Sequence, residues 1–178
     1  AGLNLLSSGS GPVNSVRGTL RGDNSLNPNG NNALVVLDAQ TGAEIQVLPN
    51  PANDFYQQPR WHPDGRRVVA VALSAAGKTI TVFDPAGQGP TSGTAKALLP
   101  VANVNLANPQ PWGDYVLYNS SQSGVDNIYA VDLAGRTFRV TSRPLGAYHA
   151  AVAPDGRTLY YAETAGARLW AYDITAPG

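Results

Sequence analysis

The sequence contains no cysteine, and its charge is sparse and balanced, with 12 basic and 12 acidic side chains among 178 residues. The lack of cysteine excludes disulfides, thiolate catalysis and zinc held by thiolates. Sparse, balanced charge creates no field that would draw the chain to nucleic acid or to an anionic membrane. We therefore expect neither of them as a partner.

Long hydrophobic runs are missing as well. No apolar run approaches the roughly 20 residues of a membrane span, and residues 1–10 lack the basic start and apolar segment of a signal peptide. We expect a soluble mature chain or an excised fragment without a membrane span. The chain does contain 19 glycines and 14 prolines, and 43% of its residues are hydrophobic, which indicates a folded, turn-rich β protein.

A turn sequence between β-prone runs occurs twice. Pro63-Asp64-Gly65 and Pro154-Asp155-Gly156 each separate two such runs. Proline presets its own φ, aspartate accepts hydrogen bonds from the backbone that follows it, and glycine adopts positive φ, so both sequences predict hairpins. The recurrence indicates a repeat protein.

An aspartate at the end of one strand marks each repeat: Asp38, Asp84, Asp132 and Asp173, spaced 46, 48 and 41 residues apart. A period in the forties, similar in length to WD40 repeats and made of short strands and turns, is typical of four-stranded propeller blades. We predict an all-β single domain of about four blades, each with four antiparallel strands, over residues 1–50, 56–100, 107–142 and 148–174. The predicted strands include 68–73, 79–84, 115–119, 128–132, 158–162 and 168–173.

The first and last units depart from this pattern. The inner strands of the first unit are predicted at residues 3–6 and 13–20, without a Pro-Asp-Gly turn between them. Too few residues follow Asp173 for an outermost strand, so the last blade is predicted to lack it. We interpret the four predicted blades as a fragment of a larger propeller, with a small four-bladed ring and an open arc as the alternatives. The edge formed by residues 168–173 is expected either to self-associate or to pair with residues 3–6.

Two sequence segments carry a family resemblance. Residues 61–70, WHPDGRRVVA, and residues 126–132, DNIYAVD, resemble the repeats of TolB-like propellers, which also occur in the gating propellers of prolyl-oligopeptidase-type peptidases. This resemblance implies a non-catalytic module that binds or gates a protein or peptide, in the periplasm or outside the cell. Residues 153–162 also resemble a blade of gluconolactonase-type propellers, which implies the alternative of a metal-dependent sugar-lactone hydrolase. The characteristic asparagine of that family is absent here, because Tyr148 and His149 stand in its place.

No catalytic residues are predicted. The run Ser8-Gly9-Ser10-Gly11 does not match the Gly-x-Ser-x-Gly nucleophile elbow, and His62 and His149 are the only histidines. No glycine-rich phosphate loop with a lysine is present.

An asparagine-rich segment, residues 23–32, offers oxygen ligands but lacks the carboxylate pattern of a calcium loop. Its interpretation as a solvated turn stands beside that of a calcium site, and no other cofactor or metal is expected.

The candidate binding group comes from aligning the units on their innermost strands. Gln58, Asn108 and His149 then fall at equivalent positions just before the strand, where they would ring one mouth of a central channel, with Tyr56 and Tyr148 as neighbours. The alternative is that they are hydrated loop residues.

The other recurring residues are predicted to be structural. Asp64 and Asp155 would cap their own turns, and the four strand-end aspartates would bond the turns that follow them. Five aromatic side chains are predicted to pack between blades: Trp61, Phe83, Tyr160, Trp170 and Tyr172.

Overall fold

A computed structural model describes residues 14–19, 32–84, 95–163 and 168–174. Fourteen strands lie in these residues, and all pairing between them is antiparallel. The described residues include no helix with the length and apolar character of a membrane span.

The strands form four sheets in chain order. Sheet 1 contains β1 (Asn14–Thr19), β2 (Ala33–Asp38) and β3 (Glu44–Val47). Sheet 2 contains β4 (Phe55–Trp61), β5 (Val68–Ser74), β6 (Gly77–Phe83) and β7 (Lys96–Ala97). Sheet 3 contains β8 (Leu106–Trp112), β9 (Tyr115–Ser120), β10 (Asn127–Asp132) and β11 (Thr137–Arg139). Sheet 4 contains β12 (Ala147–Val152), β13 (Thr158–Glu163) and β14 (Arg168–Asp173).

The all-β fold and the strands predicted in sheets 2 to 4 are confirmed. In the first unit, β1 falls within the predicted segment 13–20, whereas segment 3–6 lies outside the described residues. Residues 23–31 of the asparagine-rich segment also lie outside the described residues. Its last residue, Asn32, is described, and its backbone N–H donates to Asn53 Oδ1 at 2.7 Å.

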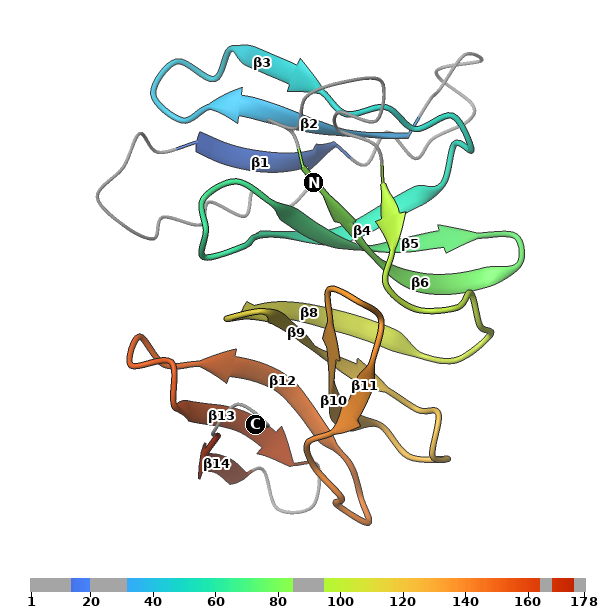
Figure 1. The fold of residues 1–178 in the computed structure, drawn as a ribbon, viewed down its shortest axis with the longest axis vertical. Coiled ribbons are helices and arrows are strands. Elements are labelled where there is room, and N and C mark those ends of the chain that lie inside the picture. Colours follow the sequence, from blue (N-terminus) through green and yellow to red (C-terminus); the bar gives the residue numbers. More distant parts are fainter. Residues whose placement is uncertain (1–13, 20–31, 85–94, 164–167, 175–178) are drawn as a thin grey trace.

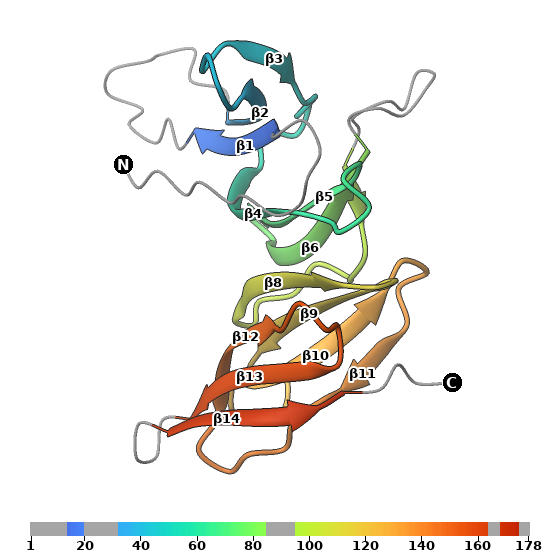
Figure 2. The ribbon, with the colours of Figure 1, turned by 90° about the vertical axis from the view of Figure 1, so that its left-hand side faces the viewer.

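The four sheets follow one another along the long axis of the molecule (Figures 1 and 2). The first strands of sheets 2, 3 and 4 contact one another in succession, β4 with β8 and β8 with β12. We call β4, β8 and β12 the inner strands. This arrangement brings equivalent positions of successive repeats side by side.

Apolar side chains fill the space between neighbouring sheets. Leu34 and Leu48 of the first unit pack with Val68, Ala70 and Phe83 of sheet 2. Sheets 2 and 3 share a second cluster: Val69, Val71, Ile80, Val82, Val116, Tyr118, Tyr129 and Val131. Sheets 3 and 4 share a third: Leu117, Ile128, Ala130, Ala147, Ala150, Leu159 and Tyr161. Because side chains alternate along a strand, sheets 2 and 3 present an apolar face to each neighbour.

The two Pro-Asp-Gly turns form as predicted. Asp64 Oδ1 accepts hydrogen bonds from the backbone N–H groups of Arg66 and Arg67, both at 2.9 Å, and Gly65 has a φ of 66°. Asp155 Oδ1 accepts from the backbone of Arg157 and Thr158 at 2.8 and 2.9 Å, and Gly156 has a φ of 69°. Partial burial opposes ionisation of Asp64, but the hydrogen bonds from Arg67 and Arg66 outweigh it and lower its pKa to about 2.

Two of the four strand-end aspartates are followed by turns that the structure describes. Asp38 Oδ1 accepts from the backbone N–H groups of Gln40 and Thr41, and Asp132 Oδ1 accepts from those of Ala134 and Arg136, as predicted. These backbone hydrogen bonds lower the pKa of both aspartates. Asp84 forms an ion pair with Arg66 across the hairpin, and Asp173 lies 4.0 Å from an Arg157 nitrogen. Most of the residues that follow these two aspartates lie outside the described residues, so their predicted turn bonds stay a prediction.

The predicted packing of the aromatic side chains is only partly correct. Phe83 is fully buried, and Trp61 and Trp170 pack against the core from partly exposed positions. Tyr160 is 39% exposed, because it lies on the face of β13 turned away from sheet 3. The Tyr172 side chain lies outside the described part of the structure.

Candidate functional site

Each of the three inner strands contains the same kind of irregularity, at Gln58 in β4, Asn108 in β8 and His149 in β12. The pairing register shifts between Gln57 and Arg60 in β4, between Ala107 and Gln110 in β8, and between Tyr148 and Ala151 in β12. Each shift is a β-bulge, which leaves extra residues unpaired and re-aims their side chains. The three residues therefore lie inside the inner strands, not just before them as the sequence predicted.

The bulges share an unusual backbone conformation. Gln58, Asn108 and His149 have φ values of 52°, 53° and 55°, a region that residues other than glycine enter rarely. Gln58 and Asn108 each precede a proline, which disfavours the right-handed helical conformation at both positions. Such conformations are costly, and they persist where the surrounding structure holds them in place.

Side-chain hydrogen bonds connect the first two bulges. The amide nitrogen of Gln58 donates to Asn108 Oδ1 at 3.2 Å, and the backbone N–H of Asn108 donates to Gln58 Oε1 at 2.6 Å. This reciprocal pair joins sheets 2 and 3 at their inner strands.

Asn119, in β9, connects the second bulge to the third. Its Oδ1 accepts from Asn108 Nδ2 at 3.2 Å and from the backbone N–H of His149 at 3.1 Å, and its Nδ2 donates to the Ala147 carbonyl at 2.6 Å. Its side chain is 1% exposed. We call Gln58, Asn108, Asn119 and His149 the inner-strand network. Sequence reasoning missed Asn119, although an asparagine inside the apolar run Tyr115–Ser120 was a signal, because a buried amide requires partners.

The two predicted tyrosines are placed differently. Tyr56 is buried, with its ring edge-on to Phe83 at 5.1 Å and its hydroxyl donating to Asn50 Oδ1 at 3.1 Å. Burial raises the pKa of Tyr56 to about 12. Tyr148 is half-buried in β12, beside His149 in the sequence, and it packs over Gly146. Tyr56 therefore belongs to the core between sheets 1 and 2, and Tyr148 borders the network.

The network presents neutral polar groups. Gln58 and His149 are exposed, and Asn108 is half-buried. Amide and imidazole groups on the inner strands of three successive sheets are therefore accessible to solvent. Within the described ranges, no three His, Asp or Glu side chains come close enough together to hold a metal ion. The inner-strand network can therefore form hydrogen bonds with polar ligands.

Comparison with solved structures reveals the architecture. The chain superposes on the protein assigned as TolB in Agrobacterium tumefaciens with a TM-score of 0.61 at 17% identity, covering 82% of this chain and 58% of that one. The TM-score against TolB from Acinetobacter baumannii is 0.54, also at 17% identity, over 82% of this chain and 38% of the other.

This chain has the fold of β-propeller blades. A propeller-containing peptidase gives the same result: the dipeptidyl peptidase 4 of Porphyromonas gingivalis matches with a TM-score of 0.52 at 14% identity, over 80% of this chain and 23% of that one. The blades described here thus span between about a quarter and three fifths of these longer chains. No protein-family model matches this chain, and no curated protein matches its sequence.

Proposed function

We propose that these propeller blades form a non-catalytic interaction or gating module that binds a protein or peptide along its inner strands, at a channel mouth. The observation that carries the proposal is the inner-strand network. Three successive blades repeat the same left-handed bulge, and hydrogen bonds link the bulges. Repeated backbone strain that is held in place at solvent-accessible polar side chains is typical of recognition sites.

The chemistry of the network suits a peptide backbone. Glutamine and asparagine amides each offer both a donor and an acceptor, which matches the N–H and C=O groups of an extended chain. Gln58 and His149 are the exposed members, so they are the side chains that would contact the ligand, with Tyr148 at the border.

The test is a selection of random linear peptides displayed on phage against the immobilised protein, followed by calorimetric titration of the peptides recovered. Double substitution of Gln58→Ala and His149→Ala should weaken their binding by about tenfold or more, because each lost hydrogen bond is worth roughly 1 kcal/mol. Gln40→Ala with Gln122→Ala, two exposed glutamines outside the inner strands, is the matched control and should change the affinity less than about twofold.

Two results would contradict the proposal. One is a selection that recovers no binding peptide. The other is equal affinity of the recovered peptides for wild type and for the Gln58→Ala, His149→Ala variant, which would place the binding surface elsewhere.

A further inference from the structure

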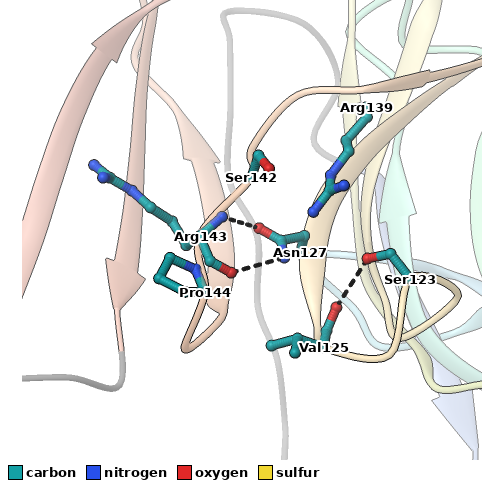
Figure 3. A pocket seen from close by; sticks show the side chains of 7 residues that line it. All are labelled: Ser123, Val125, Asn127, Arg139, Ser142, Arg143 and Pro144. Carbon is teal, nitrogen blue, oxygen red and sulfur yellow. Dashed lines mark hydrogen bonds between the residues drawn. The ribbon is translucent and has the colours of Figure 1, made fainter.

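A polar pocket of about 300 Å³ lies on sheet 3, and none of its lining residues belongs to the bulges of the inner strands (Figure 3). Its walls come from the turn before β10, the start of β10, the end of β11 and the segment that leads to β12. Its lining includes two arginines, Arg139 and Arg143, two serines, Ser123 and Ser142, and the amide of Asn127. No acidic residue lines it, so its local charge is positive.

The floor of the pocket is fixed before any ligand binds. Asn127 is fully buried, its Oδ1 accepts from the backbone N–H of Arg143 at 2.8 Å, and its Nδ2 donates to the Arg143 carbonyl at 3.2 Å (Figure 3). Thr141 Oγ1 donates to the same Oδ1 at 2.9 Å. These bonds hold segment 141–143 against β10, so little ordering of the pocket remains for a ligand to impose.

The two arginines have different surroundings. The Arg143 guanidinium extends away from the pocket (Figure 3), its centre lies 4.6 Å from the centroid of the Trp170 ring, and its Nε donates to the Tyr161 hydroxyl at 3.0 Å. Arg143 therefore joins sheet 3 to sheet 4. Arg139 is exposed, and its Nε donates to the Thr141 carbonyl at 2.9 Å. Among the described residues no carboxylate forms an ion pair with Arg139, so its two terminal nitrogens remain available for an anion.

The hydroxyl groups complete the polar rim. Ser142 is exposed beside Arg143, and Ser123 on the opposite wall accepts a hydrogen bond from the Tyr129 hydroxyl at 2.9 Å. Ser123 Oγ donates only a long bond, 3.4 Å, to the Val125 carbonyl. Its proton can therefore turn to a stronger acceptor at little cost.

We propose that this pocket binds a carboxylate group, with the Arg139 guanidinium as the charged donor and Ser142 and Ser123 as neutral donors. One unpaired guanidinium matches a singly charged, planar carboxylate, which accepts two parallel N–H bonds from it. Sites for the phosphate dianion instead gather several cations or backbone N–H groups. The carboxylate belongs either to a small organic acid or to an acidic side chain of a peptide. The pocket shares no residue with the inner-strand network, and the proposal does not depend on the proposed function.

The test is an NMR titration of the 15N-labelled protein with succinate, with a short blocked peptide carrying one glutamate, and with inorganic phosphate. We expect shifts of the Arg139 Nε–H and Ser142 amide signals that saturate with dissociation constants near the millimolar range, as befits an exposed, single-cation site. Tighter binding of the peptide than of succinate would assign the carboxylate to a peptide ligand, and the reverse order to a small acid; both orders support the site.

Matched substitutions locate the binding. Arg139→Gln should weaken carboxylate binding about tenfold, and Ser142→Ala should weaken it about two- to fivefold without unfolding the chain, since both side chains are exposed. Arg136→Gln removes an exposed arginine that pairs with Asp132, just before β11, and should leave the affinity within about twofold. Equal losses for Arg136→Gln and Arg139→Gln, tighter binding of phosphate than of either carboxylate, or no saturable shift would overturn the proposal.

Discussion

Among the described residues, sheet 3 has a neighbouring sheet on each face, whereas sheet 4 has one on a single face. Every residue of β10, in the middle of sheet 3, is buried, because sheet 2 covers one face and sheet 4 the other. In β13, the middle strand of sheet 4, Leu159 and Tyr161 face sheet 3 and are buried, whereas Tyr160 between them is 39% exposed. Leu169 in β14 is 73% exposed. The burial of a strand is thus set by its neighbours as much as by its own residues.

The largest expected effect tests this difference in burial directly. Leu117→Ala, in sheet 3 at the interface with sheet 4, should lower the free energy of unfolding by about 2–5 kcal/mol, because Leu117 is fully buried and its removal leaves a cavity. Leu169→Ala is the matched control on the bare face and should cost less than about 0.5 kcal/mol in a urea titration. Similar losses for the two variants would mean that something covers the outer face of sheet 4.

A smaller effect is expected at the two Pro-Asp-Gly turns, which lie in sheets 2 and 4. Gly65→Val and Gly156→Val should each cost about 1–3 kcal/mol, since a β-branched residue is strained at the φ values of 66° and 69°. The space beside both glycines is open, so backbone conformation and not a clash is responsible. Arg66→Ala, beside the first turn, should change the melting temperature much less, because its ion pair with Asp84 is exposed. Equal effects of the three changes would argue against the turn assignment.

Acid should weaken the same turn. The pKa of Asp64 is lowered from its ordinary 3.8 to about 2 in the folded protein. Its stabilising contribution is therefore complete above about pH 4 and is lost as the pH falls through about 2. After a discount for solvent screening of the partly exposed side chain, we expect about 1–2 kcal/mol from this group.

The measurement is the difference in unfolding free energy between pH 7 and acidic solution, for wild type and for Asp64→Asn. The difference should shrink in the variant, which has no charge to lose at this position. Asp114→Asn, at the exposed two-residue turn between β8 and β9, is the control and should leave the difference nearly unchanged. An unchanged difference in Asp64→Asn would show that the low pKa does not contribute to stability.

The smallest effect concerns the outer edge of sheet 4. No strand of the described residues pairs with the outer side of β14, and exposed Leu169 lies on this strand. We predict weak, concentration-dependent self-association, which light scattering would detect as a rising mean mass and which Leu169→Lys would reduce. Thr137→Lys, on the exposed outermost strand of sheet 3, is the control. A strictly monomeric wild-type chain would contradict this prediction.

Local sequence was sufficient to predict the hairpins and most of the strands. Pro-Asp-Gly turns and the aspartates at the strand ends act on their own neighbours, so Asp64, Asp155, Asp38 and Asp132 could be assigned from sequence alone. The equivalent spacing of Gln58, Asn108 and His149 was also visible in the aligned repeats.

The contacts between sheets could not be predicted from the sequence. The hydrogen bonds that link the bulges of β4, β8 and β12 run between sheets, and Asn119 acts as a link only because Asn108 and His149 lie on either side of it. The exposure of Tyr160 has the same origin, since alternation places it on a face whose neighbour the sequence does not reveal.

The central claim is that successive sheets stabilise one another through their facing side chains, and a double-mutant cycle tests it most directly. Leu117→Ala in sheet 3 and Leu159→Ala in sheet 4 belong to one apolar cluster, so their effects on unfolding should be coupled by about 0.5–3 kcal/mol. Leu117→Ala and Leu34→Ala belong to different clusters and should be additive within about 0.5 kcal/mol. Additive effects of Leu117→Ala and Leu159→Ala would contradict the packing of sheet 3 against sheet 4.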